Sequence, residues 1–164
     1  DEPAISRARA LNVAGWLAFA QGDYEQGKIW NREALALSRE LGDEANSACA
    51  LVALGRHSTG SPAEYEEGIA LCEEALALFR KLDDKQGLAE AINTLGELTR
   101  LAGDYERARR AYEECLVTSR EIGDKRYDVV CEGEYVDPGR RVEVTRVEGN
   151  RIVVRAVDRP EEKY

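Results

Sequence analysis

The sequence predicts a mainly α-helical protein in which an antiparallel solenoid of helical hairpins precedes a small antiparallel β meander. Two observations predict this order. A phrase that opens Gly–Asp–Tyr–Glu begins at Gly22 and again at Gly103, with a related phrase midway between them. Residues 1–124 contain 21 alanines and 3 valines, whereas residues 125–164 contain 1 alanine and 9 valines. Because alanine favours helix and valine favours strand, we expect two domains with these bounds.

The repeated phrase defines three units in a common register. Upstream of each phrase stands a glycine, and the intervals Gly15 to Gly55 and Gly55 to Gly96 are 40 and 41 residues. We therefore expect three helical hairpins over about residues 5–42, 43–83 and 84–124. The positions that coincide downstream are Tyr24, Tyr65 and Tyr105, then Gly27, Gly68 and Ala108, then Ala34, Ala75 and Cys115.

Each unit is expected to form a first helix, a turn and a second helix. The glycine in the first helix lets the second approach closely, where a larger side chain would hold the two apart. The Gly–Asp–Tyr segment supplies a turn residue, an N-cap oxygen and an aromatic side chain that fills the gap between helices. In the middle unit, Pro62 suits the first turn of a helix. An apolar stripe on the second helices has to be buried by stacking of neighbouring hairpins, and comprises Leu35, Leu37, Leu76, Leu78 and Phe79.

This pattern resembles the tetratricopeptide repeat, which has a small residue late in its first helix, a Gly–Asp–Tyr turn and small residues on its second. The resemblance covers about residues 5–124, and the period is longer than the usual ~34 residues. It looks like the long-helix version found in the helical tails of bacterial regulators and signalling ATPases. It implies a right-handed arc whose first helices line a concave face that binds an extended or helical peptide.

The resemblance also implies a set of binding residues on the first helices. Asn12 and Asn93 stand three residues before the helix glycine, where an asparagine of related arcs bonds the ligand backbone; the alternative is that both amides are only solvated. Trp16 is either an anchor for an apolar ligand side chain or a packing residue. The candidate peptide-binding residues are Arg9, Asn12, Trp16, Val52, Arg56, Glu90, Asn93, Glu97 and Arg100, and Phe19 and Cys49 lie on the same helices.

The C-terminal segment alternates apolar and polar residues in RVEVTRV and RIVVRAV, with turn signals at Gly149–Asn150 and around Pro138. It resembles about the last two-thirds of the C-terminal domain of NfeD-like proteins. The matching residues are 127–130, 132–136, Gly139, Val142, Val144 and 147–151 with the apolar strand that follows.

That resemblance implies a partial OB (oligonucleotide/oligosaccharide-binding) fold of a family that associates with stomatin-like proteins at membranes. The first barrel strand would fall where the last helix of the third unit is expected to end. Residues 117–124 can therefore be helix or strand. We favour helix, which leaves the β module incomplete.

Patterns that carry catalysis are missing from the sequence, so we expect no enzyme activity, no cofactor and no metal site. The single histidine, His57, falls in what reads as an exposed turn, and an incidental role is favoured. The cysteines Cys49, Cys72, Cys115 and Cys131 are too far apart for a metal or redox motif, so they read as small buried hydrophobes.

The charge and hydropathy of the chain bear on its partners. A net charge of −9 disfavours nucleic acid, which needs concentrated Lys and Arg. The longest apolar run, VAGWLAFA, is well short of the roughly 18 residues of a membrane span, and the first ten residues do not read as a secretory signal. We expect a cytoplasmic protein with no direct membrane insertion.

These observations favour a non-catalytic scaffold that binds a partner protein or peptide on the concave face of the arc. Two alternatives stay open. The β tail could drive assembly by self-association, through pairing of exposed strand edges. The chain could also be the sensory fragment of a larger signalling or transcription regulator.

Overall fold

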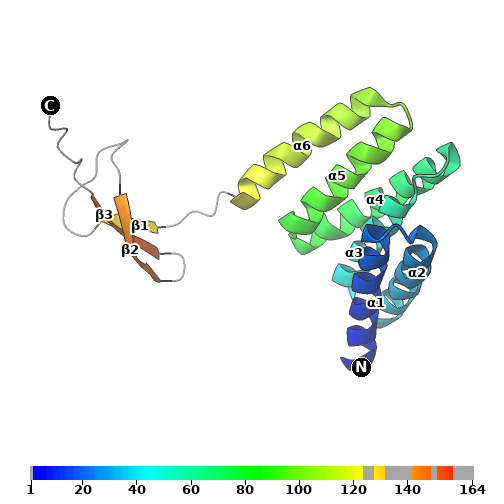
Figure 1. Ribbon diagram of the computed structural model, residues 1–164, viewed down its shortest axis with the longest axis horizontal. Coiled ribbons are helices and arrows are strands. Elements are labelled where there is room, and N and C mark those ends of the chain that lie inside the picture. Colours follow the sequence, from blue (N-terminus) through cyan, green and yellow to red (C-terminus); the bar gives the residue numbers. More distant parts are fainter. Residues whose placement is uncertain (1, 124–127, 132–141, 149–150, 157–164) are drawn as a thin grey trace. The chain divides into compact units, whose positions relative to one another are not determined.

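The structure, a computed structural model, describes residues 2–123, 128–131, 142–148 and 151–156. The chain divides into two compact units, Asp1–Gly123 and Asp124–Tyr164. The described part of the first unit is helical, and that of the second is a small sheet (Figure 1). The helices are α1 (Glu2–Ala20), α2 (Tyr24–Leu41), α3 (Glu44–His57), α4 (Pro62–Leu82), α5 (Lys85–Leu101) and α6 (Tyr105–Gly123).

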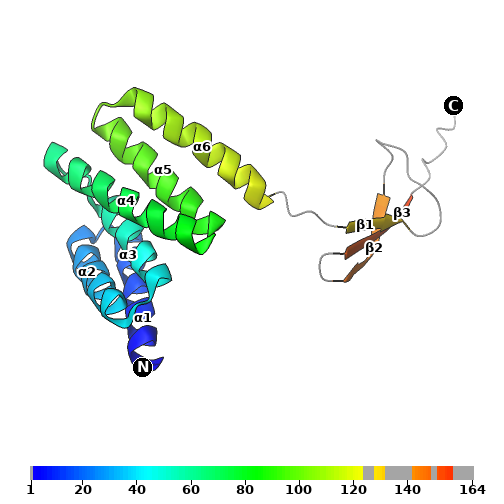
Figure 2. The same cartoon turned by 180° about the vertical axis from the view of Figure 1, so that it is seen from behind.

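The six helices form three consecutive antiparallel hairpins, α1–α2, α3–α4 and α5–α6 (Figures 1 and 2). The first helices of the hairpins form an inner layer, because α1 contacts α3 and α3 contacts α5. The backbones of the second helices, α2, α4 and α6, do not contact one another. The predicted helical-hairpin solenoid is thereby confirmed.

Aspartate and serine caps set where the helices begin. The carboxylate of Asp23 accepts a hydrogen bond from the backbone N–H of Gln26, and Asp43 and Asp84 cap α3 and α5 in the same way. Ser61 caps α4 and is followed by Pro62 at its first turn. The segments Leu41–Gly42–Asp43 and Leu82–Asp83–Asp84 therefore each contain the C-cap of one helix and the N-cap of the next.

The interior of the helical unit lies between the two helix layers. Its largest fully buried side chains include Leu51, Phe79, Ile92 and Leu98. Glycines allow the close helix contacts: a Cβ on Gly15 would lie 2.3 Å from the Asn31 amide, and one on Gly55 would lie 2.7 Å from the Cys72 sulfur. The predicted role of these glycines as close-approach positions thus has a direct geometric basis.

Helix α6 continues to Gly123, which decides how residues 117–123 fold. They form the last turns of the third hairpin and not a barrel strand, while residue 124 lies outside the described residues. No described helix has the length and apolar content that would let it cross a membrane.

The second unit contains a mixed three-stranded sheet of β1 (Asp128–Cys131), β2 (Val142–Glu148) and β3 (Arg151–Ala156), in the order β1-β3-β2. Strands β2 and β3 pair antiparallel, with a register shift between Val144 and Arg146. Strand β1 pairs parallel with β3, so that Asp128 lies opposite Arg151.

The expectation of an antiparallel meander is corrected by this parallel pairing. A meander pairs consecutive strands, and the short connection between β2 and β3 does enforce an antiparallel neighbour. The connection between β1 and β2 spans residues 132–141, which is too long to dictate which strand β1 will join. The turn expected around Pro138 lies outside the described residues.

Candidate functional site

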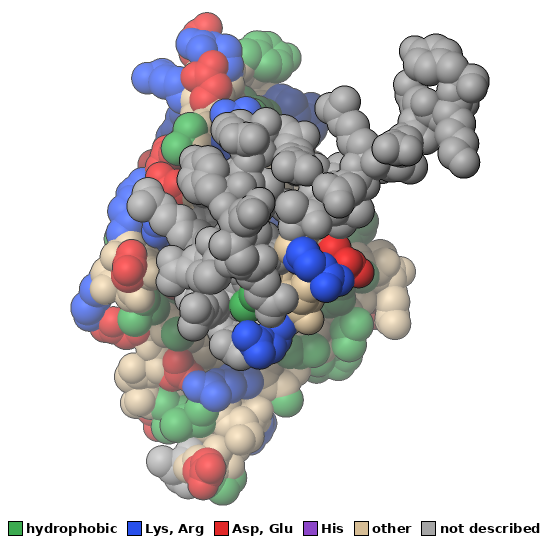
Figure 3. All heavy atoms as spheres, turned by 90° about the vertical axis from the view of Figure 1, so that its left-hand side faces the viewer, with side chains coloured by type: hydrophobic (Ala, Val, Ile, Leu, Met, Phe, Trp, Pro, Cys, Tyr) green, Lys and Arg blue, Asp and Glu red, His purple; other side chains and the backbone are tan. Residues whose placement is uncertain are grey.

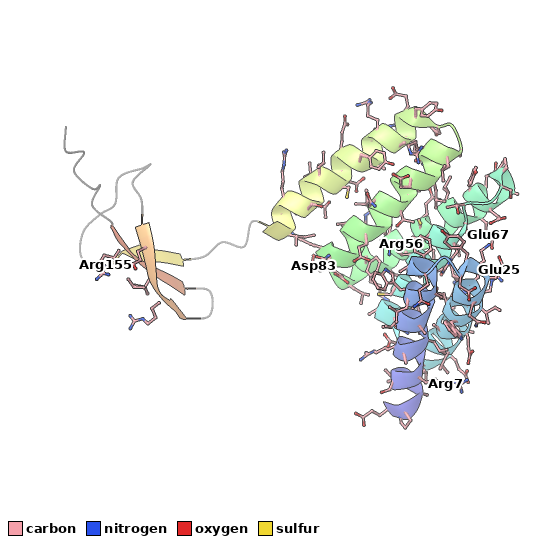
Figure 4. All side chains as sticks on the ribbon, viewed as in Figure 1. Arg7, Glu25, Arg56, Glu67, Asp83 and Arg155 are labelled. Carbon is pink, nitrogen blue, oxygen red and sulfur yellow. The ribbon has the colours of Figure 1, made fainter. Side chains whose placement is uncertain are left out.

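The inner layer of helices forms a groove of about 530 Å³, whose walls come from α1, α3 and α5. Arg56, labelled in Figure 4, belongs to the central wall, α3. The groove is lined by Arg9, Asn12, Val13, Trp16, Asp43, Ala45, Asn46, Cys49, Val52, Ala53, Arg56, Phe79, Asp84, Gln86, Gly87 and Glu90.

The apolar lining has an exposed wall and a buried base. Val13 and Trp16 on α1 are 59% and 51% exposed. Val52 on α3 and Phe79 on α4 reach the same groove but are almost completely buried. Trp16 therefore presents an exposed aromatic ring in the groove, beside the exposed side chain of Val13.

The charged lining contains more acid than base. Arg9 donates to Asp43 at 3.5 Å, and Arg56 donates to Glu90 at 3.4 Å, so both arginines already have carboxylate partners. Asp84 is the remaining lining carboxylate, and it accepts a hydrogen bond from the backbone N–H of Gly87. Elsewhere on the helical unit, Figure 3 shows acidic and basic side chains interspersed over the visible surface.

The carboxylates of the groove affect the pKa of the Cys49 thiol. Cys49 lies in the groove and is exposed. Partial burial raises the pKa of its thiol, and the nearby carboxylates Glu90, Asp84 and Asp43 raise this pKa further. The lining carries three carboxylates and two arginines, so a positively charged group entering the groove would meet a weakly favourable potential.

A chain of buried polar side chains lies behind the α1 wall and links α1, α2 and α3. The amide of Asn31 donates to Asn12 Oδ1 at 2.9 Å, and the amide of Asn12 donates to Asn46 Oδ1 at 2.8 Å. The amide of Asn46 donates to the Ser38 hydroxyl at 2.6 Å, and this hydroxyl donates to the carbonyl of Ala34 at 2.7 Å. We call this set, together with His57, the amide chain.

The direction of the amide chain is fixed by its last acceptor. A backbone carbonyl only accepts, so Ser38 must donate to it and must accept from Asn46. Each preceding amide then points the same way, and Asn31 presents its oxygen to His57 Nε2 at 3.1 Å. His57 is therefore the donor at the start of the chain, with its proton on Nε2.

His57 is buried, and the expectation that it lies in an exposed turn is wrong. It is the last residue of α3, 3% exposed, and its ring packs edge-on against Phe19 at a centroid distance of 5.3 Å. Its Nδ1 has no hydrogen-bond partner among the described residues. Desolvation by burial is the main cause that lowers the pKa of the imidazole. The positive charges of Lys28 and Arg56 also lower this pKa, and the carboxylate of Glu25 raises it.

The structure brings together most of the predicted binding residues. Those that line the groove are Arg9, Asn12, Trp16, Val52, Arg56 and Glu90, with Cys49 beside them. Asn12 contributes an edge of its side chain only, because it is buried and its amide is already bonded to Asn31 and Asn46.

The other predicted residues lie outside the groove. Asn93, Glu97 and Arg100 are exposed farther along α5, where Arg100 and the Tyr112 hydroxyl both donate to Glu97, at 2.8 Å and 2.6 Å. Phe19 packs against Tyr24 and His57 instead of facing the groove.

Sequence reasoning missed the groove residues at the starts of α3 and α5. Asp43 and Asp84 follow Leu41–Gly42 and Leu82–Asp83, a pattern that indicates a turn but no binding role. Asn46 and Gly87 occupy equivalent positions in adjacent repeats and have different side chains, so the repeat pattern did not single them out.

Comparison with known proteins agrees with this architecture. Residues 63–120 match the tetratricopeptide repeat family, and residues 118–155 match the "NfeD-like C-terminal, partner-binding domain". The resemblances to both families inferred from the sequence are thereby confirmed. The second match begins inside α6, so its first residues are helical in this chain. No curated protein matches the sequence.

Two solved structures resemble the fold. The tetratricopeptide-repeat domain of FLU from Arabidopsis is 22% identical, with a TM-score of 0.64, and the match covers 74% of this chain and 100% of that one. BtubC (BKLC) from P. vanneervenii is 20% identical, with a TM-score of 0.61, and the match covers 87% of this chain and 54% of that one. This chain therefore spans about half of BtubC. At these identities the likeness shows the fold: the helical unit has the tetratricopeptide-repeat fold.

Proposed function

We propose that the helical unit is a non-catalytic scaffold that binds a segment of a partner protein in the groove between α1, α3 and α5. The proposal rests on the exposed indole of Trp16, which lies in the same groove as the buried apolar side chains of Val52 and Phe79. Such a concave site, apolar with a few placed charges, is the usual form of a peptide-binding groove.

The charges of the groove indicate which segments fit it. Arg9 is paired with Asp43 and Arg56 with Glu90, so Asp84 gives the groove one carboxylate more than it has arginines. A segment with an apolar side chain for Trp16 and a Lys or Arg a few residues away would satisfy both features. Electrostatic complementarity of this kind contributes more to selectivity and association rate than to affinity.

A random dodecapeptide library displayed on phage, selected on the full chain, tests this proposal. We expect the enriched peptides to carry apolar and basic residues, and to slow alkylation of Cys49 as measured by peptide mass mapping. They should also change tryptophan fluorescence saturably in a Trp30→Phe variant, in which Trp16 is the sole tryptophan. Substitution Trp16→Ala should weaken binding at least about tenfold, as truncation of an aromatic anchor does.

Ile29→Ala is the matched control, because Ile29 is as exposed as Trp16 but lies on α2, outside the groove. This variant should bind as the parent does. Peptides that bind Trp16→Ala with unchanged affinity and leave Cys49 reactive would exclude the groove as the binding site.

The sheet unit is a second candidate for a partner site. Residues 118–155 match a domain described as partner-binding, and the outer strands β1 and β2 each pair on one side only among the described strands. We propose that a partner strand can add to one of these edges. Peptides that bind the full chain but are indifferent to Trp16→Ala would favour this second site.

A further inference from the structure

The outer face of α6 differs from the equivalent faces of α2 and α4. Leu35, Leu76 and Leu116 occupy the same place in the three repeats, eight residues after Gly27, Gly68 and Ala108. Leu35 and Leu76 are 8% and 5% exposed, whereas Leu116 is 59% exposed. Helices α2 and α4 are each followed by a further hairpin, whereas α6 lies at the end of the row of helices (Figures 1 and 2).

Polar groups around this leucine show the same difference. Arg39 on α2 donates to Glu74 on α4 at 2.5 Å, and Arg80 on α4 donates to Glu114 on α6 at 3.4 Å. Arg120 is the equivalent residue of the third repeat, and it has no carboxylate partner among the described residues. Next to Leu116, Val117 is 55% exposed.

This face therefore has the residues that bind a following helix, but no described helix lies on it. Terminal repeats of solenoid proteins usually present a polar outer surface, and an exposed apolar patch next to an unpaired charge commonly marks an interface. The described elements that follow α6 are strands, so the described residues supply no further helix for this face.

The spacing of charges on α6 makes the same helix of a second copy a suitable partner. Glu113, Leu116 and Arg120 share one helix face, at intervals of three and four residues. If two copies of α6 cross antiparallel at Leu116, residues after this leucine lie opposite residues before it. Arg120 of each copy then faces Glu113 of the other, so the same ion pair forms twice, as the symmetry of a two-fold contact requires.

We propose that the chain self-associates through α6, with Leu116 of two copies in contact and Arg120 paired with Glu113 across a two-fold axis. Glu113 already accepts a hydrogen bond from Arg109 at 2.7 Å, and its carboxylate has capacity for a second donor. The contact uses neither the groove nor the strand edges, so it is independent of both proposed binding sites.

Sedimentation equilibrium of the full chain, under reducing conditions and over a range of concentrations, tests the proposal. The parent chain should show a monomer–dimer equilibrium, and Leu116→Glu should weaken dimerisation at least about tenfold. Ile29→Glu is the matched control, because Ile29 is 54% exposed on a helix outside the contact, and it should leave the equilibrium unchanged.

Charge reversal tests the geometry itself. Glu113→Arg and Arg120→Glu should each weaken the dimer when tested alone, since each brings like charges together. An equimolar mixture of the two variants should associate again, because every facing pair is then opposite in charge. A parent chain that is monomeric at all concentrations, or a dimer insensitive to Leu116→Glu, would overturn the proposal. So would a mixture that fails to associate.

Discussion

The two junctions between successive hairpins use equivalent positions with opposite chemistry. At the first junction, Ser38 of α2 accepts a hydrogen bond from Asn46 of α3. At the second, Phe79 of α4 packs on Gly87 of α5, where a Cβ would come within 2.2 Å of the ring. Ser38 and Phe79 are equivalent in the repeat register, as are Asn46 and Gly87. A polar pair and an aromatic ring on a glycine thus fill the same space.

The contrast extends into the inner layer. Asn12, in the amide chain of the first junction, is equivalent to Val52 at the second, and Asn31 is equivalent to Cys72. All four side chains are buried. The repeat therefore prescribes the size and position of a contact but not its polarity. A polar junction adds a condition that an apolar one lacks, because each buried donor and acceptor needs a partner.

The apolar junction should show the largest effect of a single truncation. Phe79→Ala removes a ring that is 2% exposed and leaves a cavity beside Gly87, so we expect a loss of about 3–5 kcal/mol in the free energy of unfolding. Urea unfolding followed by circular dichroism measures it. Ser38→Ala, at the equivalent position, should cost less, about 1–3 kcal/mol, because it deprives Asn46 of one acceptor. Equal losses at the two positions would contradict the contrast.

The polar junction should respond most to loss of Asn31, the first amide of the amide chain. Asn31→Leu leaves Asn12 Oδ1 without its donor and His57 Nε2–H without its acceptor, so we expect a loss of about 2–4 kcal/mol. The same unfolding measurement applies. Cys72→Ala is the comparison at the equivalent position and should cost less than Asn31→Leu, because Cys72 is the smaller side chain and no hydrogen-bonded chain depends on it.

A variant that carries the residues of the second junction at the first tests whether the polar residues act together. Combining Asn12→Val, Asn31→Cys, Ser38→Phe and Asn46→Gly replaces the polar residues with the side chains of the other junction. We expect the combined loss to be smaller than the sum of the single losses by more than about 1 kcal/mol, because the partners are removed together. A combined loss equal to that sum would mean that the amides do not act as a unit.

The polar junction should also make stability depend on pH. The pKa of His57 is lowered in the folded state, so below the unfolded value of 6.5 the unfolded chain binds more protons. The stability from the neutral imidazole is complete above that value and is lost as the pH falls from it through the lower folded pKa. His57→Gln keeps a donor for Asn31 but does not titrate. Melting temperatures between pH 8 and pH 5 should fall more steeply for the parent chain, and equal slopes would exclude His57 as the cause.

The smallest effect is expected at the glycine of the third hairpin. A Cβ on Gly96 would lie 2.8 Å from the ring of Tyr112, which is partly exposed and can move. Alanine is also about 1 kcal/mol better than glycine inside a helix, so Gly96→Ala should be within about 1 kcal/mol of the parent chain. Gly15→Ala should be clearly destabilising in the same unfolding measurement, because its Cβ would displace Asn31 from the amide chain. The reverse order would contradict the account.

Local residues were enough to predict the hairpins. Aspartates at the turns determine where α2, α3, α5 and α6 begin, and the close-approach glycines allow the helices to pair closely. The resemblance to the tetratricopeptide repeat then assigned Arg9, Trp16 and Glu90 to the inner layer, because they lie on the first helices of the repeats.

Contacts that depend on unlike residues at distant positions were not predictable. Asn12 reads as a free amide in sequence, but Asn31 and Asn46 occupy its hydrogen bonds from other helices. His57 reads as a turn residue, although α3 extends to include it. The partner of β1 was also undetermined, because alternation predicts a strand and its faces but not its neighbour.

The proton position on His57 shows whether a one-way series of buried amide hydrogen bonds holds the first junction. The protein has one histidine, so long-range ¹H–¹⁵N correlation of the imidazole gives a single assignable pattern. The directions of these hydrogen bonds predict a neutral ring at pH 7, with the proton on Nε2 and with Nδ1 unprotonated. A proton on Nδ1 alone, or an imidazolium at that pH, would contradict it.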